Sequence, residues 1–319
     1  MGHTSVRIAS VGSCVPDNVV TNADLARFVD TSDEWITTRT GIKQRYLSPK
    51  DAPVSASELG TKAAARALEK AGLAAADVDA VICATFTPDY FFPSTACRIQ
   101  DELGCTGAFA FDISAACTGF IYGLTMANSL ILSGQCRTVV LVGSEIISRT
   151  LDWTDRTTCI LFGDAAGAAV LTAGDTPGTG ILSACLGSNG SLGEILFLPA
   201  WGEHRFMKMK GNEVFKHAVR LMSESVQTAC GKAGVTVDQL DYLVPHQANV
   251  RIINGLAGHL GVAPDKVVTN IERYGNTSSA SIPLALEDAM NAGKIKAGSL
   301  VALTALGGGI TMGSAIVRF

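Results

Sequence analysis

Two stretches of the chain, about half its length apart, share one pattern. Residues 67–82 have the sequence ALEKAGLAAADVDAVI and residues 229–244 have ACGKAGVTVDQLDYLV, an offset of 162 positions. Each copy indicates the end of an amphipathic helix, a glycine that ends it, a polar turn and a short buried strand. Two apolar runs, at 138–144 and 300–306, repeat the offset. Two matches in register favour an internal duplication over chance.

The duplicated pattern also indicates a fold class. Its strands are continuous apolar runs that alternate with helices, which is typical of sheets buried on both faces. We therefore predict an α/β fold of two similar halves, residues 1–172 and 173–319, joined by a turn-rich connection at 172–180. Such halves can pack with their equivalent strand ends at a shared centre, where we expect the active site.

Composition narrows the class of partner. Of the 319 residues, 47% are apolar and only 17% are charged, below the roughly 25% of an average soluble chain. This balance excludes disorder and favours a surface that is partly buried against another chain. The net charge of −4 gives no overall attraction to nucleic acid or acidic lipid. We expect neither nucleic acid nor membrane as a partner.

The cysteines and the N-terminus predict a cytoplasmic location. The chain has nine cysteines and no C-x-x-C pair, which favours inert thiols in a reducing compartment over disulfides or a zinc ribbon. Residues 1–16 lack the charged start and apolar core of a secretory signal. No stretch reaches the roughly 18 apolar residues of a membrane span.

Cys117 is the candidate nucleophile. It lies between a predicted strand at 109–114 and a predicted apolar helix at 119–134. A thiol at a helix N-terminus meets unpaired N–H groups and the positive end of the helix dipole, so we expect the reactive thiolate to be favoured. The alternative is a packed core cysteine at a tight turn, so partner residues must decide.

His246 is the candidate partner, because it follows a buried strand and begins the polar cluster His246–Asn249, which we expect to start a helix. The helix dipole at that point would keep the imidazole neutral and able to donate a hydrogen bond to an oxyanion. A purely structural histidine is the alternative. The other histidines lie at the terminus, in a basic helix-like segment or on a polar helix turn: His3, His204, His217 and His259.

Asn276 is the third candidate. It follows a predicted strand at 267–271, precedes a helix predicted from about Ser281, and stands near the position of Cys117 in the repeat register. Capping of a turn is the alternative role. The glycine run 307–309 either offers N–H groups to an oxyanion or only forms a hairpin turn.

Cysteine, histidine and asparagine in this order are also typical of papain-type hydrolases. The local signature of that class around the cysteine is missing here, and the duplicated α/β pattern does not belong to it.

The motifs closely resemble those of beta-ketoacyl-ACP synthase III, the thiolase-fold condensing enzymes that start bacterial fatty acid synthesis. The resemblance covers essentially the whole chain and lies in four long motifs in the right order: DISAACTGF around Cys117, PHQANVRI around His246, YGNTSSAS around Asn276 and GGGITMGSA from Gly307. It implies a thiolase-like fold with α-β-α-β-α layers.

The resemblance also implies a reaction, in which acetyl-CoA and malonyl-ACP give acetoacetyl-ACP, CoA and carbon dioxide without a metal or organic cofactor. Cys117 would carry the acetyl group and, with Gly308, offer N–H groups to the tetrahedral oxyanion. His246 and Asn276 would donate to the malonyl thioester oxygen during decarboxylation. Phe162 would keep water from the thioester.

Further positions match the family's substrate contacts. The CoA and pantetheine tunnel is matched at Trp35, Arg39, Arg156, Asn212, Phe215, Ala248 and Asn249. Arg251 matches the main docking residue for the acidic carrier protein, and the basic stretch 205–220, with Lys216, would extend that face. Many relatives carry two further basic residues where this chain has Gly258 and His259, which puts the strength of docking in doubt. A solvated helix face is the alternative for 205–220.

Phe92 matches a residue that crosses a homodimer interface and closes the partner's acyl pocket, which implies a short primer. Three alternatives stay open at this point: a condensing enzyme of secondary metabolism with another primer or with malonyl-CoA, a cysteine hydrolase, and a non-catalytic acyl-CoA-binding protein.

Overall fold

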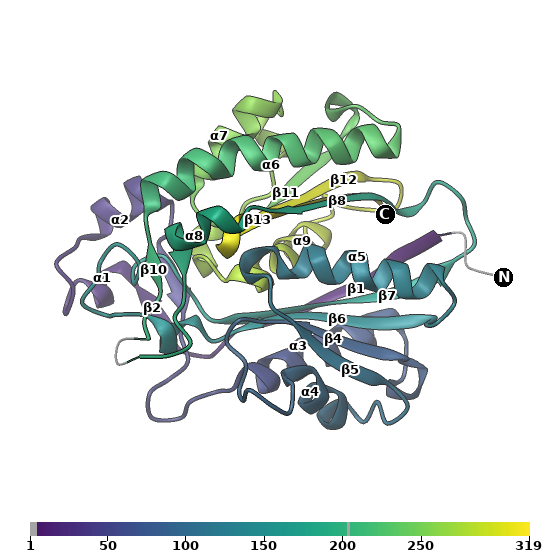
Figure 1. The fold of residues 1–319 in the computed structure, drawn as a ribbon, viewed down its shortest axis with the longest axis horizontal. Coiled ribbons are helices and arrows are strands. Elements are labelled where there is room, and N and C mark those ends of the chain that lie inside the picture. The colour runs from purple at the N-terminus through teal and green to yellow at the C-terminus, as the bar shows by residue number, and fades with distance from the viewer. Residues whose placement is uncertain (1–4, 203–204) are drawn as a thin grey trace.

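Two sheets form the framework of the computed structural model, which describes residues 5–202 and 205–319 (Figure 1). In this part of the chain the first sheet has the order β1 (Ser5–Cys14), β7 (Ala165–Gly174), β6 (Thr138–Glu145), β4 (Ala80–Ala84) and β5 (Phe109–Ile113). The second has the order β11 (Tyr242–Pro245), β12 (Leu300–Gly307), β13 (Thr311–Arg318) and β8 (Gly180–Ser188).

Helices cover both faces of both sheets. The outer face of the first sheet carries α3 (Ala56–Ala71) and α4 (Thr95–Leu103), and that of the second carries α6 (Gly211–Ala233) and α7 (Val250–Leu260). Between the sheets lie α5 (Gly119–Leu132) and α9 (Ser281–Asn291), which contact strands of both. Figure 1 shows these five layers from bottom to top, which confirms the predicted α-β-α-β-α architecture.

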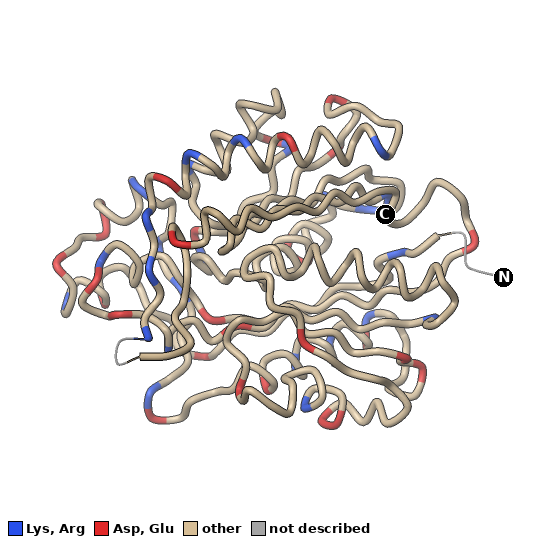
Figure 2. The backbone as a smooth tube through the Cα atoms, viewed as in Figure 1, with Lys and Arg blue, Asp and Glu red and all other residues tan. Residues whose placement is uncertain are grey.

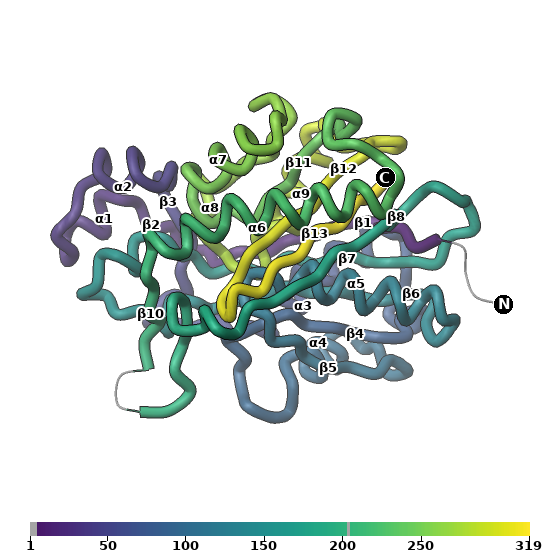
Figure 3. The backbone as a smooth tube through the Cα atoms, turned by 45° about the horizontal axis from the view of Figure 1, so that its top comes forward, coloured from purple at the N-terminus to yellow at the C-terminus, as the bar shows by residue number. Residues whose placement is uncertain are grey.

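The shorter elements gather at one end of the sheets, at the left of Figures 1 and 3. They are β2 (Val19–Thr21), α1 (Asn22–Leu25), α2 (Asp33–Thr40), β3 (Gln44–Tyr46), β9 (Leu196–Phe197), β10 (Lys208–Met209) and α8 (Ile271–Tyr274).

The structure confirms the duplication. Helices α3 and α6 both end at a glycine in the left-handed conformation, Gly72 and Gly234. The starts of β6 and β12, Thr138 and Leu300, keep the same offset of 162 residues. The chain passes from the first sheet to the second within residues 175–179, because β7 continues to Gly174. The division into domains at residue 172 stays a prediction.

The repeated offset reaches the strand–helix junctions. Single 3-10 turns, η2 (Ala116–Thr118) and η7 (Ser278–Ala280), precede α5 and α9. Each begins with a non-glycine residue at positive φ, Ala116 at 47° and Ser278 at 51°. Such conformations are uncommon outside glycine and persist only where the surroundings impose them. The two halves therefore present one strained turn each to the centre of the molecule.

Two predicted segments are corrected. The predicted strand at 267–271 is reduced to a single parallel bridge between Val267 and Leu243, because the chain then turns into α8. The basic stretch 205–220 is helical only from Gly211, since β10 pairs with β9 just before it. The predictions for His3 and His204 lie outside the described residues.

Two further findings concern membrane helices and the cysteines. Among residues 5–202 and 205–319, no helix combines the length and the apolar character needed to cross a membrane. All nine cysteines lie in the described ranges and each is a free thiol.

Candidate active site

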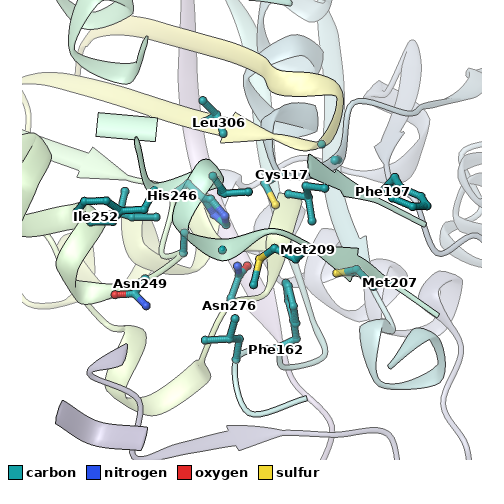
Figure 4. A pocket seen from close by; sticks show the side chains of 18 of the residues that line it. Cys117, Phe162, Phe197, Met207, Met209, His246, Asn249, Ile252, Asn276 and Leu306 are labelled. Carbon is teal, nitrogen blue, oxygen red and sulfur yellow. The ribbon is translucent and has the colours of Figure 1, made fainter. Parts of the chain in front are cut away.

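A cavity of about 1070 Å³ opens between the two halves (Figure 4). Cys117, His246, Asn276 and Gly308 all line it. So do all the positions matched to the CoA tunnel, together with Phe162 and Arg251: Trp35, Arg39, Arg156, Asn212, Phe215, Ala248 and Asn249. Lys216 and Phe92 do not line it.

The turn η2 places Cys117 at the closed end of this cavity. The hairpin of β12 and β13, closed by η8 (Gly308–Ile310), is pinned against it. Thr118 Oγ1 lies 3.1 Å from the Thr311 carbonyl oxygen, and Thr311 Oγ1 lies 3.2 Å from the Ala115 carbonyl oxygen. A Cβ on Gly307 would stand 2.9 Å from the Cys117 nitrogen, so only glycine permits this approach. The glycine run thus brings the hairpin directly against the backbone of the turn that carries Cys117.

The expectation of a favoured thiolate is wrong for the resting site. Burial raises the pKa of Cys117 to about 12, because the charged sulfur would lose its hydration. The Ser278 hydroxyl, which has no nitrogen or oxygen partner among the described residues, lowers the pKa by a smaller amount. The position at a helix start is correct, but desolvation outweighs it. Cys117 rests as a neutral thiol.

His246 is neutral as predicted, although for a different reason. Helix α7 begins only at Val250, and its N-cap is Asn249, so His246 continues the strand instead: its N–H donates to the Thr304 carbonyl at 2.8 Å. Burial, not a helix dipole, lowers the pKa of His246 to about 3. Its imidazole stays uncharged throughout the physiological range.

Ser281 determines which imidazole nitrogen carries the proton. Its Oγ lies 2.6 Å from His246 Nδ1 and 3.4 Å from the Gln247 N–H, which can only donate. Among the described residues Nδ1 is the one acceptor within hydrogen-bond distance of the Ser281 proton, so Nδ1 accepts it. The proton of the neutral ring must stand on Nε2, so the ring offers an N–H donor.

A hydrogen bond also fixes the orientation of the Asn276 amide. Its Oδ1 accepts from the Ser278 N–H at 2.9 Å, which leaves the side-chain NH₂ as the free end. Its backbone pairs with the Phe162 segment: Asn276 N donates to Leu161 O at 2.8 Å, and Gly163 N donates to Asn276 O at 3.0 Å. Phe162 is therefore fixed beside Asn276. In the repeat register, however, the residue equivalent to Cys117 is Ser279, three positions later than Asn276.

Together these groups form a reactive site without charge. Figure 4 shows Cys117, His246 and Asn276 gathered around one space. A thiol there faces two N–H donors that cannot act as strong bases. Such a site can stabilise negative charge that develops on a substrate oxygen, and donors that are already in place are the largest contribution to many enzymatic accelerations.

The mouth of the cavity, in contrast, carries charged side chains. Two guanidinium groups lie close to the Trp35 ring, with Arg39 at 4.6 Å and Arg156 at 5.1 Å from its centroid. Arg156 also contacts Asp30 at 3.4 Å. An aromatic ring can stack a planar base, and the guanidinium groups beside it can bind phosphate.

Sequence reasoning missed several lining and supporting residues. The cavity wall includes Phe86, Phe197, Met207 and Met209 from segments that carry no motif. Ser281 is the last residue of the motif around Asn276, but nothing in the sequence indicates its contact with His246. Glu145 ends an otherwise apolar strand, and that contrast was the signal for it.

Comparison with known proteins decides the family. The model described as 3-Oxoacyl-[acyl-carrier-protein (ACP)] synthase III matches residues 111–190, and the model of its C-terminal part matches residues 230–319. The beta-ketoacyl-[acyl-carrier-protein] synthase III of Granulibacter bethesdensis is 50% identical over 318 residues, which cover 98% of each chain. The chain belongs to the beta-ketoacyl-ACP synthase III family.

Solved structures agree with this assignment. The crystal structure of 3-oxoacyl-[acyl-carrier-protein] synthase III from Aquifex aeolicus is similar with a TM-score of 0.95 and 47% identity, covering 99% of this chain and 100% of that one. The priming beta-ketosynthase of the R1128 polyketide pathway is similar with a TM-score of 0.94 and 35% identity, covering 99% and 96%. These likenesses confirm the predicted thiolase-like fold and its condensing-enzyme family.

We predict that Ser281→Ala selectively weakens the step that uses the Nε2 proton. Without the Ser281 donor, part of the imidazole carries its proton on Nδ1. Malonyl decarboxylation should fall about three- to tenfold, as expected for one net hydrogen bond of about 1 kcal/mol. Acylation of Cys117 should stay unchanged. Release of carbon dioxide and intact mass after acetyl-CoA treatment measure the two steps.

Ser10→Ala is the matched control. Ser10 is a buried serine that donates to the Ala67 carbonyl at 2.6 Å, and it does not line the cavity. An equal loss in both steps for Ser281→Ala would indicate a purely structural role.

Proposed function

We propose that this chain condenses a short acyl-CoA, with acetyl-CoA as the preferred primer, with malonyl-ACP to give 3-oxoacyl-ACP, CoA and carbon dioxide, the first condensation of fatty acid synthesis. One observation carries the proposal: a buried cysteine faces two oriented N–H donors at the inner end of a cavity whose mouth presents Trp35 with two arginines close to its ring. Membership of the synthase III family supports it.

In the first half-reaction the Cys117 sulfur attacks the acyl-CoA carbonyl carbon. The carbonyl oxygen becomes an oxyanion, and the N–H groups of Cys117 and Gly308 receive it. The C–S bond to CoA then breaks, the acyl group stays on Cys117, and the thiol proton leaves with the CoA sulfur as CoA–SH. Because Cys117 rests as a thiol, this proton must move during the step.

In the second half-reaction the malonyl carboxylate leaves as carbon dioxide. The electron pair of the broken C–C bond becomes an enolate, whose oxygen accepts from His246 Nε2–H and the Asn276 NH₂. The enolate carbon attacks the acyl carbonyl, and Cys117 leaves as a thiolate that takes a proton from solvent. No metal or organic cofactor is required, since the departing carboxylate itself generates the carbanion. Phe162 covers this space against water.

The outer cavity fits the CoA portion of the substrate. Trp35 would stack on the adenine, with Arg39 and Arg156 placed for phosphate. Asn212, Phe215, Ala248 and Asn249 line the passage between this mouth and Cys117 and would contact the pantetheine arm. Gly308 stands at its inner end.

One observation also favours a different primer, of the kind used in polyketide synthesis. The likeness to the R1128 priming ketosynthase shows that this architecture serves polyketide pathways as well. A panel of acyl-CoA primers with malonyl-ACP and with malonyl-CoA separates the two candidates, and a clear preference for a primer longer than propionyl would favour the polyketide type.

The acidic carrier protein would dock on the basic face beside the mouth. Figure 2 shows Lys and Arg concentrated along β10 and the start of α6. Arg251 on α7 is exposed and also lines the cavity, and the exposed Lys216 stands on α6, which packs on α7. Arg220 is already paired with Glu224 at 2.9 Å. Docking here would point the carrier's arm into the cavity.

We further propose that the chain acts as a homodimer in the cytoplasm. β5 is the edge strand of the first sheet, and Phe109 at its start is 46% exposed. Phe91 and Phe92 in a nearby loop are 81% and 86% exposed. An unpaired edge with large exposed rings is typical of a surface that a second chain covers. Phe92 would then reach the partner's acyl pocket, and nine free thiols suit a reducing compartment.

Intact mass and carbon dioxide release test the reaction itself. Acetyl-CoA should acetylate the wild-type chain but not Cys117→Ala. His246→Ala and Asn276→Ala should still be acetylated, while malonyl decarboxylation falls by about 10²–10³-fold, as for loss of one oxyanion donor. A chelator should change neither step. Rapid release of free acetate in place of condensation would instead support a hydrolase, and binding without acylation would support a non-catalytic acyl-CoA-binding protein.

Arg251→Glu tests docking. Reversal of one rim charge should raise KM for malonyl-ACP about three- to tenfold, with the larger effect at low salt. Lys294→Glu, a charge reversal of an exposed lysine beyond α9, is the control. An equal rise of KM for acetyl-CoA would contradict a carrier-specific role and assign Arg251 to CoA.

Sedimentation equilibrium tests the dimer. The wild type should sediment as a dimer, whereas Phe92→Glu with Phe109→Glu should dissociate, because two carboxylates would be buried at the interface. Phe28→Glu, at a comparably exposed ring (58%), should leave the dimer intact. A monomeric wild type would overturn the proposal.

A further inference from the structure

Glu145 is a buried carboxyl that the proposed reaction does not use. It ends β6 and is fully buried, and no salt bridge reaches it within residues 5–202 and 205–319. A carboxylate buried without a cation is costly, so such a group tends to keep its proton. Burial raises the pKa of Glu145 from 4.5 to about 7.

One oxygen of Glu145 is held by donors alone. Its Oε2 lies 2.6 Å from the Thr87 hydroxyl, 3.2 Å from the Thr85 hydroxyl and 3.2 Å from the Phe86 N–H. The Thr85 and Thr87 oxygens accept from the backbone N–H groups of Thr87 and Ile146, which leaves both hydroxyl protons available for the carboxyl. Oε2 is therefore the carbonyl-like oxygen.

The other oxygen, Oε1, meets a hydroxyl whose proton is already placed. Ser279 Oγ lies 3.0 Å from Glu145 Oε1 and 2.8 Å from the Ala84 carbonyl oxygen. A carbonyl oxygen can only accept, so Ser279 gives its single proton to the shorter contact with Ala84. The contact between Ser279 and Oε1 then needs a proton on the carboxyl.

We propose that Glu145 is a positioning residue that acts as a neutral carboxylic acid, with its proton on Oε1 donated to Ser279. In this form it joins the loop that carries Phe86, which lines the cavity, to the turn that supports Asn276. Oε2 holds the loop with Phe86, and Oε1 holds η7, the turn that begins two residues after Asn276. Ser279 is also the duplicate of the nucleophile position, so the second half uses that position as an anchor.

The neutral form also keeps negative charge away from the nucleophile. An ionised Glu145 would raise the pKa of the Cys117 and Cys83 thiols by charge repulsion. The nearby cation, Arg149, donates to the carbonyls of Thr87 and Pro88. Charge on Glu145 would therefore act against the thiolate and the oxyanions that form at Cys117.

The other charged groups on the neighbouring elements are carboxyls with partners of their own. Asp89 accepts from the N–H groups of Ala56 and Ser57 at 2.8 and 3.1 Å. Asp164 accepts from the N–H groups of Ser48 and Ser148 at 2.7 and 2.8 Å. Neither carboxyl supplies a positive charge that would favour ionisation of Glu145.

Glu145→Gln is the decisive variant, because its amide copies the acid: the NH₂ donates to Ser279 and the carbonyl accepts from Thr87. We expect both half-reactions to stay within about threefold of wild type near neutral pH. Glu145→Ala should lose about tenfold or more, with its donors left unsatisfied. Asp164→Asn is the matched control. Its NH₂ would face N–H donors, so this variant should unfold at a lower temperature than Glu145→Gln.

Infrared spectroscopy gives a readout that does not depend on the proposed reaction. The wild type should show a carboxylic acid C=O band that shifts in D₂O, disappears above about pH 8 and is absent from Glu145→Gln. A wild type without such a band near about pH 5.5, or a folded Glu145→Gln as inactive as Glu145→Ala, would overturn the proposal. Failure of condensation with an intact band would count against the proposed reaction alone.

Thermal unfolding at different pH values tests how the Glu145 proton contributes to stability. The folded-state pKa of Glu145 lies above its unfolded value, so the native state binds the extra proton between about pH 4.5 and about 7. As the pH rises through that window, wild-type stability should fall relative to that of Glu145→Gln. Below and above the window, the difference in Tm between the two proteins should be constant. A constant difference across the whole range would contradict the neutral acid.

Discussion

The backbone of η7 passes so close to β6 that a Cβ on Gly143 would lie 2.4 Å from the Ser279 carbonyl oxygen. This contact joins the two halves directly behind Cys117 and leaves no room for water. An ionisable group at the junction must therefore find a protein partner or give up its charge. The same burial raises the pKa of Cys117 and Glu145 and lowers that of His246. The floor of the cavity is therefore free of charge.

Much of this arrangement could be predicted from local sequence. The offset of the repeat places both turns, because helix ends, glycine caps and apolar strands are local signals. Cys117 and Ser281 fall at the predicted junctions. The predicted thiolate failed because the pKa of a thiol depends on what packs over the helix start, and that information lies in the other half of the chain. The predicted strand at 267–271 failed for a similar reason, since the side chain of Gln247 captures the Asn270 N–H at 3.0 Å and redirects the chain.

The duplication explains how one site is assembled from two unlike copies. At equivalent turns the first half has Cys117 and the second has Ser279, whose hydroxyl faces Ala84 and Glu145. One copy therefore points a reactive atom into the cavity, and the other secures the junction from behind. The residue that faces the cavity in the second half is Asn276, three positions earlier, where a backbone bridge to Phe162 fixes its direction. Symmetry supplies the framework, and departures from it supply the chemistry.

The division between mouth and floor fits the charges of the proposed substrates. CoA and the carrier protein bring phosphate and acidic groups, which the arginines at the mouth can attract from solvent. The floor receives only the thioester and a malonyl carboxylate. A neutral floor gives that carboxylate no cation to stabilise it, so its loss as uncharged carbon dioxide is favoured over its retention. The two N–H donors then stabilise the enolate that remains, and their fixed orientation lets them do so without rearrangement. On this reasoning, a cation placed beside Asn276 would strengthen malonyl binding and slow its decarboxylation.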